Sequence, residues 1–168
     1  VRYGNVFGSS GSVIPKFIEQ INNNKKITIT DPKMTRFSVT MNQALDFILK
    51  ATQKGRGTEI FIPELKAYSL QQIKDVLSDL TNTKGHEIIG VRTGEKQHEV
   101  LINSDEIRYA WSYENMFMLI NELHEIKTLD KIYPKIKKIK NLHVYSSDKA
   151  KLLSTEEITK NIKDLQLL

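Results

Sequence analysis

The apolar residues of this chain recur at helical spacing in four stretches. Three of these stretches are preceded by a capping box, in which a Ser or Thr is followed three residues later by Gln or Glu. The boxes are Thr40 with Gln43, Ser69 with Gln72, and Ser154 with Glu157. The remaining stretch follows Ser12, carries Pro15 in its first turn and stops at Asn22–Asn24. The pattern therefore predicts four helices, which begin after residues 12, 40, 69 and 154.

The helix after Thr40 is predicted to be amphipathic and to end at Gly55–Gly57. Its apolar residues recur on one face, and they are Met41, Ala44, Leu45, Ile48 and Leu49.

Three short runs between the helices are predicted to be strands: Ile27–Thr30, Glu59–Ile62 and Glu87–Val91. Strands that alternate with helices indicate an α/β layer structure. The opening residues, Val1–Val6, are interpreted as the tail of a strand that runs into a glycine-rich loop. Because a domain seldom starts inside a strand, we interpret the sequence as the later part of a longer protein. Right-handed crossovers predict that Glu59–Ile62 lies parallel to the strand ending at Val6.

The composition is that of a globular protein. The 168 residues include 39 % hydrophobic and 27 % charged side chains, and the formal net charge is +5. The absence of Cys excludes a disulfide scaffold, a thiolate metal site and a cysteine nucleophile. The longest uninterrupted apolar run is Met116–Ile120, far below the roughly 20 residues of a spanning helix. With no secretion leader visible either, we expect a cytoplasmic protein with no membrane partner.

Two further patterns yield no site. His-Glu pairs begin at His86, His98 and His124, but none continues to the second His of the zinc-protease motif, so no metal site is expected. The lysine-rich stretch Leu129–Asn141 lacks the interleaved aromatic residues and the recognition module of a nucleic-acid patch. We interpret it as a solvated surface loop, and no nucleic-acid partner is expected.

Three separated segments supply the parts of a diphosphate site. The glycine-rich loop Gly4–Ser12 ends at a helix N-terminus, where free backbone N–H groups favour an anion. The turn Thr30–Phe37 presents Arg36, and the loop Arg92–Lys96 presents Arg92. A guanidinium can grip two phosphate oxygens at once, so two arginines and a helix N-terminus together predict a diphosphate clamp. Taken singly, either arginine is better explained by a surface ion pair.

Taken in order, these motifs resemble one family. The matching segments are Arg2–Val6, Gly8–Pro15, Met34–Phe37, and Gly90–Lys96 with His98–Glu99. They are similar to the C-terminal half of the polysaccharide-biosynthesis nucleotide-sugar dehydratases, which are extended short-chain dehydrogenases. The tail, Tyr145–Ser147 followed by Leu153–Glu157, resembles the inverting UDP-N-acetylglucosamine 4,6-dehydratases of pseudaminic acid synthesis. The resemblance covers the chain except for Leu123–Asn141.

The resemblance implies an α/β fold that is the C-terminal part of an extended short-chain dehydrogenase. Residues 1–168 would form a Rossmann-like sheet remnant and a small substrate-binding α/β subdomain, and the NADP-binding N-terminal Rossmann half would be absent. The implied function is the UDP-sugar-binding portion of an NADP-dependent, C5-inverting dehydratase in surface polysaccharide or nonulosonic acid biosynthesis. The full-length enzyme is expected to be a homo-oligomer.

The resemblance also implies roles for individual residues. Arg2, Tyr3, Gly4 and Asn5 would lie on the cofactor side of the cleft, with Asn5 also facing the sugar diphosphate. Substrate contacts would come from further positions. In this assignment Val13, Pro15 and Phe17 lie along the substrate, Thr30 and Met34 flank the uracil, Arg36 and Arg92 hold the diphosphate, and Glu95 contacts the uridine ribose.

The family's catalytic residues are not found in this sequence. Such enzymes oxidise the sugar at C4, eliminate water across C5 and C6 with an Asp-Lys pair, and use a Tyr-x-x-x-Lys pair for oxidation. Two pairs have the Tyr-x-x-x-Lys spacing, Tyr133/Lys137 and Tyr145/Lys149. The motif requires a helix, which Pro134 excludes for the first pair and the turn Ser146–Asp148 excludes for the second. The chain also lacks a glycine-rich dinucleotide motif. We therefore assign no catalytic residue and expect no turnover by this chain alone.

Alternatives of another class stay open. The chain could be a non-catalytic UDP-sugar-binding or scaffolding module, or part of another extended short-chain dehydrogenase acting on a UDP-sugar, such as an epimerase. It could also be a fragment, one product of a split gene, or a degenerate remnant.

Overall fold

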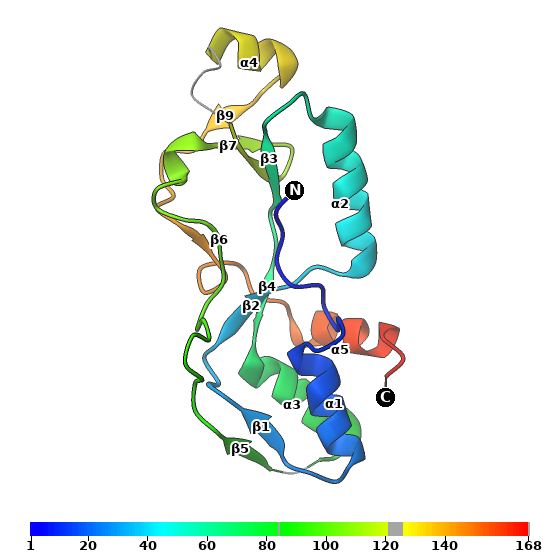
Figure 1. Ribbon diagram of the computed structural model, residues 1–168. Coiled ribbons are helices and arrows are strands. Elements are labelled where there is room, and N and C mark those ends of the chain that lie inside the picture. Colours follow the sequence, from blue (N-terminus) through cyan, green and yellow to red (C-terminus); the bar gives the residue numbers. More distant parts are fainter. Residues whose placement is uncertain (84, 121–125, 168) are drawn as a thin grey trace.

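The computed structural model describes residues 1–83, 85–120 and 126–167 (Figure 1). The helices are α1 (Val13–Asn22), α2 (Met41–Lys54), α3 (Leu70–Thr81), α4 (Ile126–Ile132) and α5 (Thr155–Asp164), with a short 3-10 helix at Ile107–Tyr109. The strands are β1 (Ile27–Ile29), β2 (Thr35–Phe37), β3 (Ile60–Pro63), β4 (Ala67–Ser69), β5 (His86–Ile88), β6 (Val100–Ile102), β7 (Ala110–Tyr113), β8 (Met116–Leu119), β9 (Lys137–Lys138) and β10 (Tyr145–Ser146).

Within the described residues the strands form four small sheets. The largest has the order β3-β8-β7-β9 and is antiparallel throughout. The pairs β2-β4 and β6-β10 are also antiparallel, whereas β1 and β5 pair in parallel. The protein therefore has the mixed α/β class that the sequence predicts.

Three apolar clusters hold the elements together. The first lies among α1, α3, α5 and β1, with Ile14, Ile27, Ile73 and Ile158 fully buried, in the lower half of Figure 1. The second joins α2 and α4 to the four-stranded sheet. The third lies between them, around Phe37 of β2. Among the described residues, no helix combines the length and apolarity needed to cross a membrane.

The predicted helices and their caps are confirmed. All three capping boxes form, with each Ser or Thr side chain accepting from the backbone N–H three residues later. Helix α1 begins after Ser12 and ends at Asn22, as its pattern indicates. These features depend on residues within one turn of each other, which is why the sequence predicts them well.

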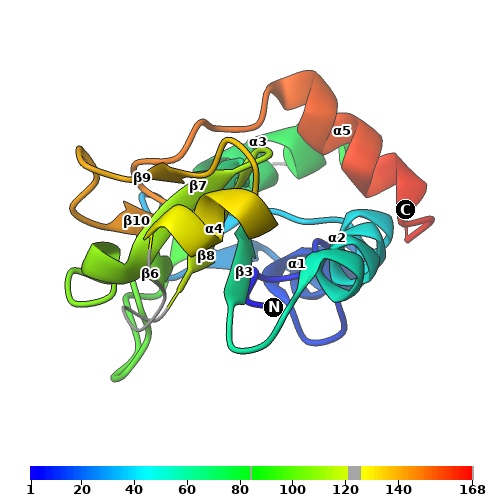
Figure 2. The same cartoon turned by 90° about the horizontal axis from the view of Figure 1, so that it is seen from above.

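The apolar face of α2 is largely exposed. Met41, Leu45 and Leu49 keep 57 %, 51 % and 62 % of their surface in solvent, while Ala44 and Ala51 are buried. The helix runs alongside β3 at one side of the molecule in Figure 1, and Figure 2 shows it from above. Only one side of α2 therefore has a partner within the described chain.

The predicted parallel pairing of β3 with a strand ending at Val6 is not formed. Residues 1–5 are irregular, and Val6 makes a single parallel bridge to Val39. The opening segment touches β3 through one hydrogen bond, from the Arg2 N–H to the Phe61 carbonyl at 2.8 Å. Strand β3 instead pairs with β8, whose run Met116–Leu119 is mostly buried. Strand β3 is the end strand of its sheet, so among the described residues its other edge is not paired with a strand.

The lysine-rich stretch is more ordered than a solvated loop. Its lysines are exposed, but Leu129 and Tyr133 are 2 % exposed and pack in the second cluster. The Tyr133 hydroxyl donates to Glu59 at 2.8 Å, and β9 pairs with β7. The Lys138 ammonium lies 4.8 Å from the centre of the Trp111 ring, a cation–π geometry.

Candidate functional site

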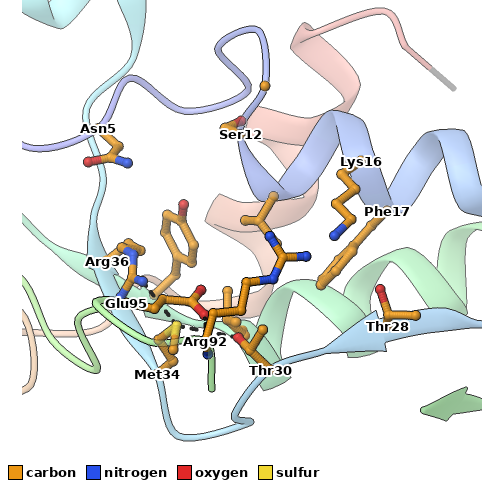
Figure 3. A pocket seen from close by; sticks show the side chains of 14 residues that line it. Asn5, Ser12, Lys16, Phe17, Thr28, Thr30, Met34, Arg36, Arg92 and Glu95 are labelled. Atoms are coloured by element: carbon orange, nitrogen blue, oxygen red, sulfur yellow. Dashed lines mark hydrogen bonds between the residues drawn. The ribbon is translucent and has the colours of Figure 1, made fainter. Parts of the chain in front are cut away.

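A pocket of about 250 Å³ opens between α1, the strands β1 and β2, and the loop that follows β5 (Figure 3). Its walls come from segments that are far apart in the chain. The lining residues are Asn5, Gly11, Ser12, Val13, Lys16, Phe17, Thr28, Thr30, Met34, Arg36, Tyr68, Leu70, Arg92 and Glu95. Three of these side chains are cationic and one is a carboxylate, so the pocket is suited to an anionic ligand.

The N-terminus of α1 forms one wall. Gly11 has φ +75°, a backbone conformation that glycine adopts without strain, and it turns the chain into Ser12 at the N-cap. The Ser12 side chain makes no capping hydrogen bond, and its Oγ is buried without a partner among the described residues. The first N–H groups of a helix lack partners within the helix and carry a partial positive charge. This wall therefore presents donors to the pocket.

Arg36 is held firmly at the opposite wall. Its Nη1 donates to the carbonyls of Thr35 at 2.7 Å and Gln97 at 3.2 Å, and its Nη2 donates to Met34 Sδ at 3.0 Å. Its Nε lies 3.9 Å from Glu99 Oε1. Burial raises the pKa of the Glu99 carboxyl, and the Phe37 N–H and the nearby guanidinium oppose that rise. Arg36, the middle residue of β2, is thus a cation held in place by its neighbours.

Arg92 lines the pocket with a guanidinium that has no partner among the described residues. It lies in a turn that closes on itself, with Glu95 N–H donating to the Arg92 carbonyl at 3.0 Å and Arg92 N–H donating to Glu95 Oε2 at 3.2 Å. Its guanidinium makes no hydrogen bond or ion pair within the part of the chain that the structure describes. Figure 3 shows the side chain extending into the pocket between Arg36 and Lys16.

The structure brings together eight of the nine residues that the sequence assigns to substrate. They are Asn5, Val13, Phe17, Thr30, Met34, Arg36, Arg92 and Glu95. Pro15 does not line the pocket, because it follows Ile14 onto another side of α1, where it is half-buried. Convergence in one pocket does not test the assigned roles, which stay predictions.

Several lining residues were missed in the sequence. Lys16 lies one helical turn after Val13, a spacing that places both on one face of α1 and could have identified it. Tyr68 comes from β4, which pairs with β2, so only the sheet brings it beside Arg36. Its ring meets Phe7 edge-on at 5.6 Å, and burial raises the pKa of its hydroxyl.

The residues assigned to the cofactor, Asn5 apart, lie outside this pocket. Arg2 donates through Nη1 and Nη2 to both oxygens of Glu106 at 2.8 Å, and through Nη1 to the Leu101 carbonyl at 2.8 Å. Tyr3 is half-buried, and Gly4 packs against Phe37.

The Arg2–Glu106 pair predicts a pH effect on stability. Hydrogen bonds from Arg2 hold the pKa of Glu106 below its usual value of 4.5, so the stabilisation is present above that value. It is lost as pH falls through the lowered pKa. Glu106→Gln is expected to show a smaller loss of unfolding free energy between pH 7 and pH 3 than the parent chain, measured by urea titration. Asp105→Asn is the control, because it removes one negative charge at the neighbouring position. Equal acid sensitivity of the parent and Glu106→Gln chains would contradict the prediction.

Gly4 is predicted to be required for packing. A Cβ at this position would lie 2.5 Å from Phe37 Cβ, whose side chain is fully buried. Gly4→Ala should therefore lower the unfolding free energy by about 1–3 kcal/mol, the usual range for an overpacked site. Gly57→Ala is the matched control, since nothing lies within 4 Å of a Cβ there. Thermal or urea unfolding measures both, and equal effects would refute the packing role.

No group of three His, Cys, Asp or Glu suited to a metal ion occurs among the described residues. The pair His124-Glu125, noted in the sequence, lies outside them.

Comparison with known proteins gives consistent matches. Residues 1–121 match the family described as polysaccharide biosynthesis protein. The UDP-N-acetylglucosamine 4,6-dehydratase (inverting) of Campylobacter jejuni serotype O:2 is 35 % identical over 162 residues, which is 93 % of this chain and 48 % of that protein. The UDP-glucose 4-epimerase of Rickettsia bellii is 35 % identical over 165 residues, or 98 % of this chain and 48 % of that protein.

A solved structure also matches this chain. The X-ray structure of Pen from Bacillus thuringiensis matches with a TM-score of 0.81 and 36 % identity, over 98 % of this chain and 49 % of that one. The chain thus spans about half the length of the curated relatives it matches.

Proposed function

The chain belongs to the polysaccharide biosynthesis protein family, and from this membership we propose that it is the UDP-sugar-binding part of an NADP-dependent UDP-N-acetylglucosamine 4,6-dehydratase of the C5-inverting type. The pathway would be surface polysaccharide or nonulosonic acid biosynthesis. The observation that carries the proposal is the convergence of Arg36, Arg92 and the α1 N-terminus on one pocket.

The diphosphate is proposed to lie between Arg36 and Arg92. A diphosphate diester carries two negative charges, and the pocket offers Lys16, Arg36 and Arg92 against the single carboxylate of Glu95. Charge-assisted hydrogen bonds from guanidinium to phosphate are the strong ones, and helix N–H donors add to them. Asn5, at the same opening, would donate its amide to the sugar diphosphate.

The uridine is proposed to lie deeper, against β1 and β2. Met34 and Phe17 line the pocket although each is only 1 % exposed, so a base placed here would touch the edge of this apolar packing beside the Thr30 hydroxyl. The Glu95 carboxylate can accept hydrogen bonds from two vicinal ribose hydroxyls. Glu95 also bonds the Arg92 N–H, so ribose and diphosphate recognition would be coupled in one loop.

NADP is proposed to be held mainly by an N-terminal half that lies outside these 168 residues. The relatives are about twice as long, and Arg2, Tyr3 and Gly4 do not line the pocket described above. The exposed apolar side chains of α2 are consistent with a larger protein, because such a stripe is ordinarily covered. This chain's own residues would bind and orient the UDP-sugar, while the oxidation and elimination residues would come from the other half.

A second candidate is a UDP-glucose 4-epimerase, favoured by Rickettsia relatives that are as similar as the dehydratases. Both reactions leave the UDP moiety intact, so the pocket serves either. A full-length protein would distinguish them: a dehydratase turns UDP-N-acetylglucosamine into a 4-keto-6-deoxy sugar, whereas an epimerase only inverts C4.

Calorimetry on the 168-residue chain tests the proposal. We expect saturable one-to-one binding of UDP and of UDP-N-acetylglucosamine, because the uridine and diphosphate contacts are all within the chain. NADP is expected to give no saturable binding. Absence of UDP binding by a chain whose circular dichroism shows it to be folded would refute the binding proposal. A one-to-one NADP isotherm would refute the proposal that NADP is bound mainly by the N-terminal half.

A further inference from the structure

Three segments meet directly behind Arg36. They are β2, the segment Gln97–Glu99 that follows the Arg92 loop, and Ser147, which comes just after β10. Ser147 is fully buried and Thr35 is 8 % exposed, so their polar atoms are shielded from water. Ser147 lies 112 positions from Thr35 in the sequence. This buried polar cluster is not part of the pocket lining.

Hydrogen bonds join the three segments at one hydroxyl. Ser147 Oγ lies 2.7 Å from Thr35 Oγ1 and 3.2 Å from the Thr35 carbonyl, and it accepts from Glu99 N–H at 2.9 Å. Ser147 N–H donates to the Glu99 carbonyl at 2.8 Å. The same Thr35 Oγ1 also lies 2.8 Å from His98 Nδ1. One buried serine thus fastens β2 to Glu99.

The same groups fix the guanidinium of Arg36. The Thr35 carbonyl, which Ser147 Oγ approaches, accepts from Arg36 Nη1 at 2.7 Å. Glu99 Oε2 accepts from Phe37 N–H at 3.1 Å, and this leaves Oε1 beside Arg36 Nε. With Nη1 satisfied by two carbonyls, the remaining N–H of Nη2 is available to a ligand.

We propose that Ser147 and Glu99 are positioning residues that hold Arg36 in its ligand-binding orientation before the ligand arrives. The inference rests on the proposed function, because it assumes that Arg36 grips an anion. A flexible arginine must lose rotamer freedom on binding, and a pre-ordered one has already done so. The C-terminal part of the chain thereby contributes to a pocket that it does not line.

The first test uses a double-mutant cycle with UDP in calorimetry. Ser147→Ala is expected to raise the dissociation constant roughly fivefold to thirtyfold, an effect within the range for coupled neighbours. In an Arg36→Ala background, the same change should alter the constant by less than about twofold. Ser146→Ala is the matched control, since Ser146 is also buried but bonds Asp148 instead. An equal loss in both backgrounds would show a general structural role and overturn the proposal.

The second test needs no ligand. The Arg36 Nε–H signal in a nitrogen-15 NMR spectrum, assigned by its loss in Arg36→Lys, should exchange slowly with water in the parent chain. Glu99→Gln keeps an acceptor for Phe37 N–H but removes the charge beside Nε, so it should accelerate that exchange, as should Ser147→Ala. Unchanged exchange in both variants would overturn the proposal.

The two tests separate this inference from the proposed function. If the parent chain binds no UDP, the proposed function fails, whereas the NMR test still decides whether Ser147 and Glu99 hold Arg36. If UDP binds but the cycle shows no coupling, the positioning role fails and the binding site stands. Thermal unfolding of each variant identifies any that has lost its fold, and the other variant then carries the test.

Discussion

Replacing Arg92 by alanine is expected to raise the dissociation constant for UDP by roughly tenfold to a hundredfold, because a hydrogen bond to a charged group is worth about 1.5–3 kcal/mol. The Arg92 guanidinium has no partner among the described residues, and the two hydrogen bonds of Arg92 with Glu95 use backbone atoms that alanine keeps, so the substitution removes ligand contacts alone. Its exposure also means that the fold should be unaffected. Calorimetry at low and high salt measures the effect, and the loss should be larger at low salt.

A control variant and kinetics on a full-length enzyme test the Arg92 prediction further. Arg56→Ala removes an exposed arginine whose guanidinium donates to Gly55 away from the pocket, and it should leave UDP binding unchanged. In a full-length enzyme, Arg92→Ala should raise KM far more than it lowers kcat, because the diphosphate is bound alike in ground and transition states. An unchanged KM would mean that the diphosphate assignment is wrong.

Replacing Phe17 by alanine is expected to lower the unfolding free energy by about 3–5 kcal/mol, the range for truncating a buried aromatic residue. Phe17 lines the pocket, but it is 1 % exposed and belongs to the cluster that α1 shares with α3, α5 and β1. Its main contribution is therefore to stability. Urea unfolding at constant pH measures the change.

Two variants serve as comparisons for Phe17→Ala. Phe17→Leu keeps most of the apolar volume and should lose much less stability. Leu49→Ala truncates an apolar residue that is 62 % exposed on α2, and its effect should stay within about 0.5 kcal/mol. If Phe17→Ala were as mild as Leu49→Ala, Phe17 would be a ligand contact and not a core residue.

The secondary structure was partly predictable. The capping boxes at Thr40, Ser69 and Ser154 identified helix starts because caps involve only neighbouring residues. Strand β8 was missed, although its run Met116–Leu119 was noticed for its apolarity. The preceding pair Glu114 and Asn115 has positive φ values of 44° and 59°, and asparagine in such a two-residue hairpin turn was the available signal.

The sequence by itself determined the positions of the helix caps, the α/β class, the family, and most of the residues that meet in the pocket. Only the tertiary structure decided what surrounds them. It holds Arg36 between Gln97 and Glu99 and leaves Arg92 free, although the two look alike in sequence. It also left the apolar face of α2 exposed and tied Ser147 to Thr35. The reason is physical: caps and periodicity act within a few residues, whereas burial and buried hydrogen bonds depend on which distant segments pack together.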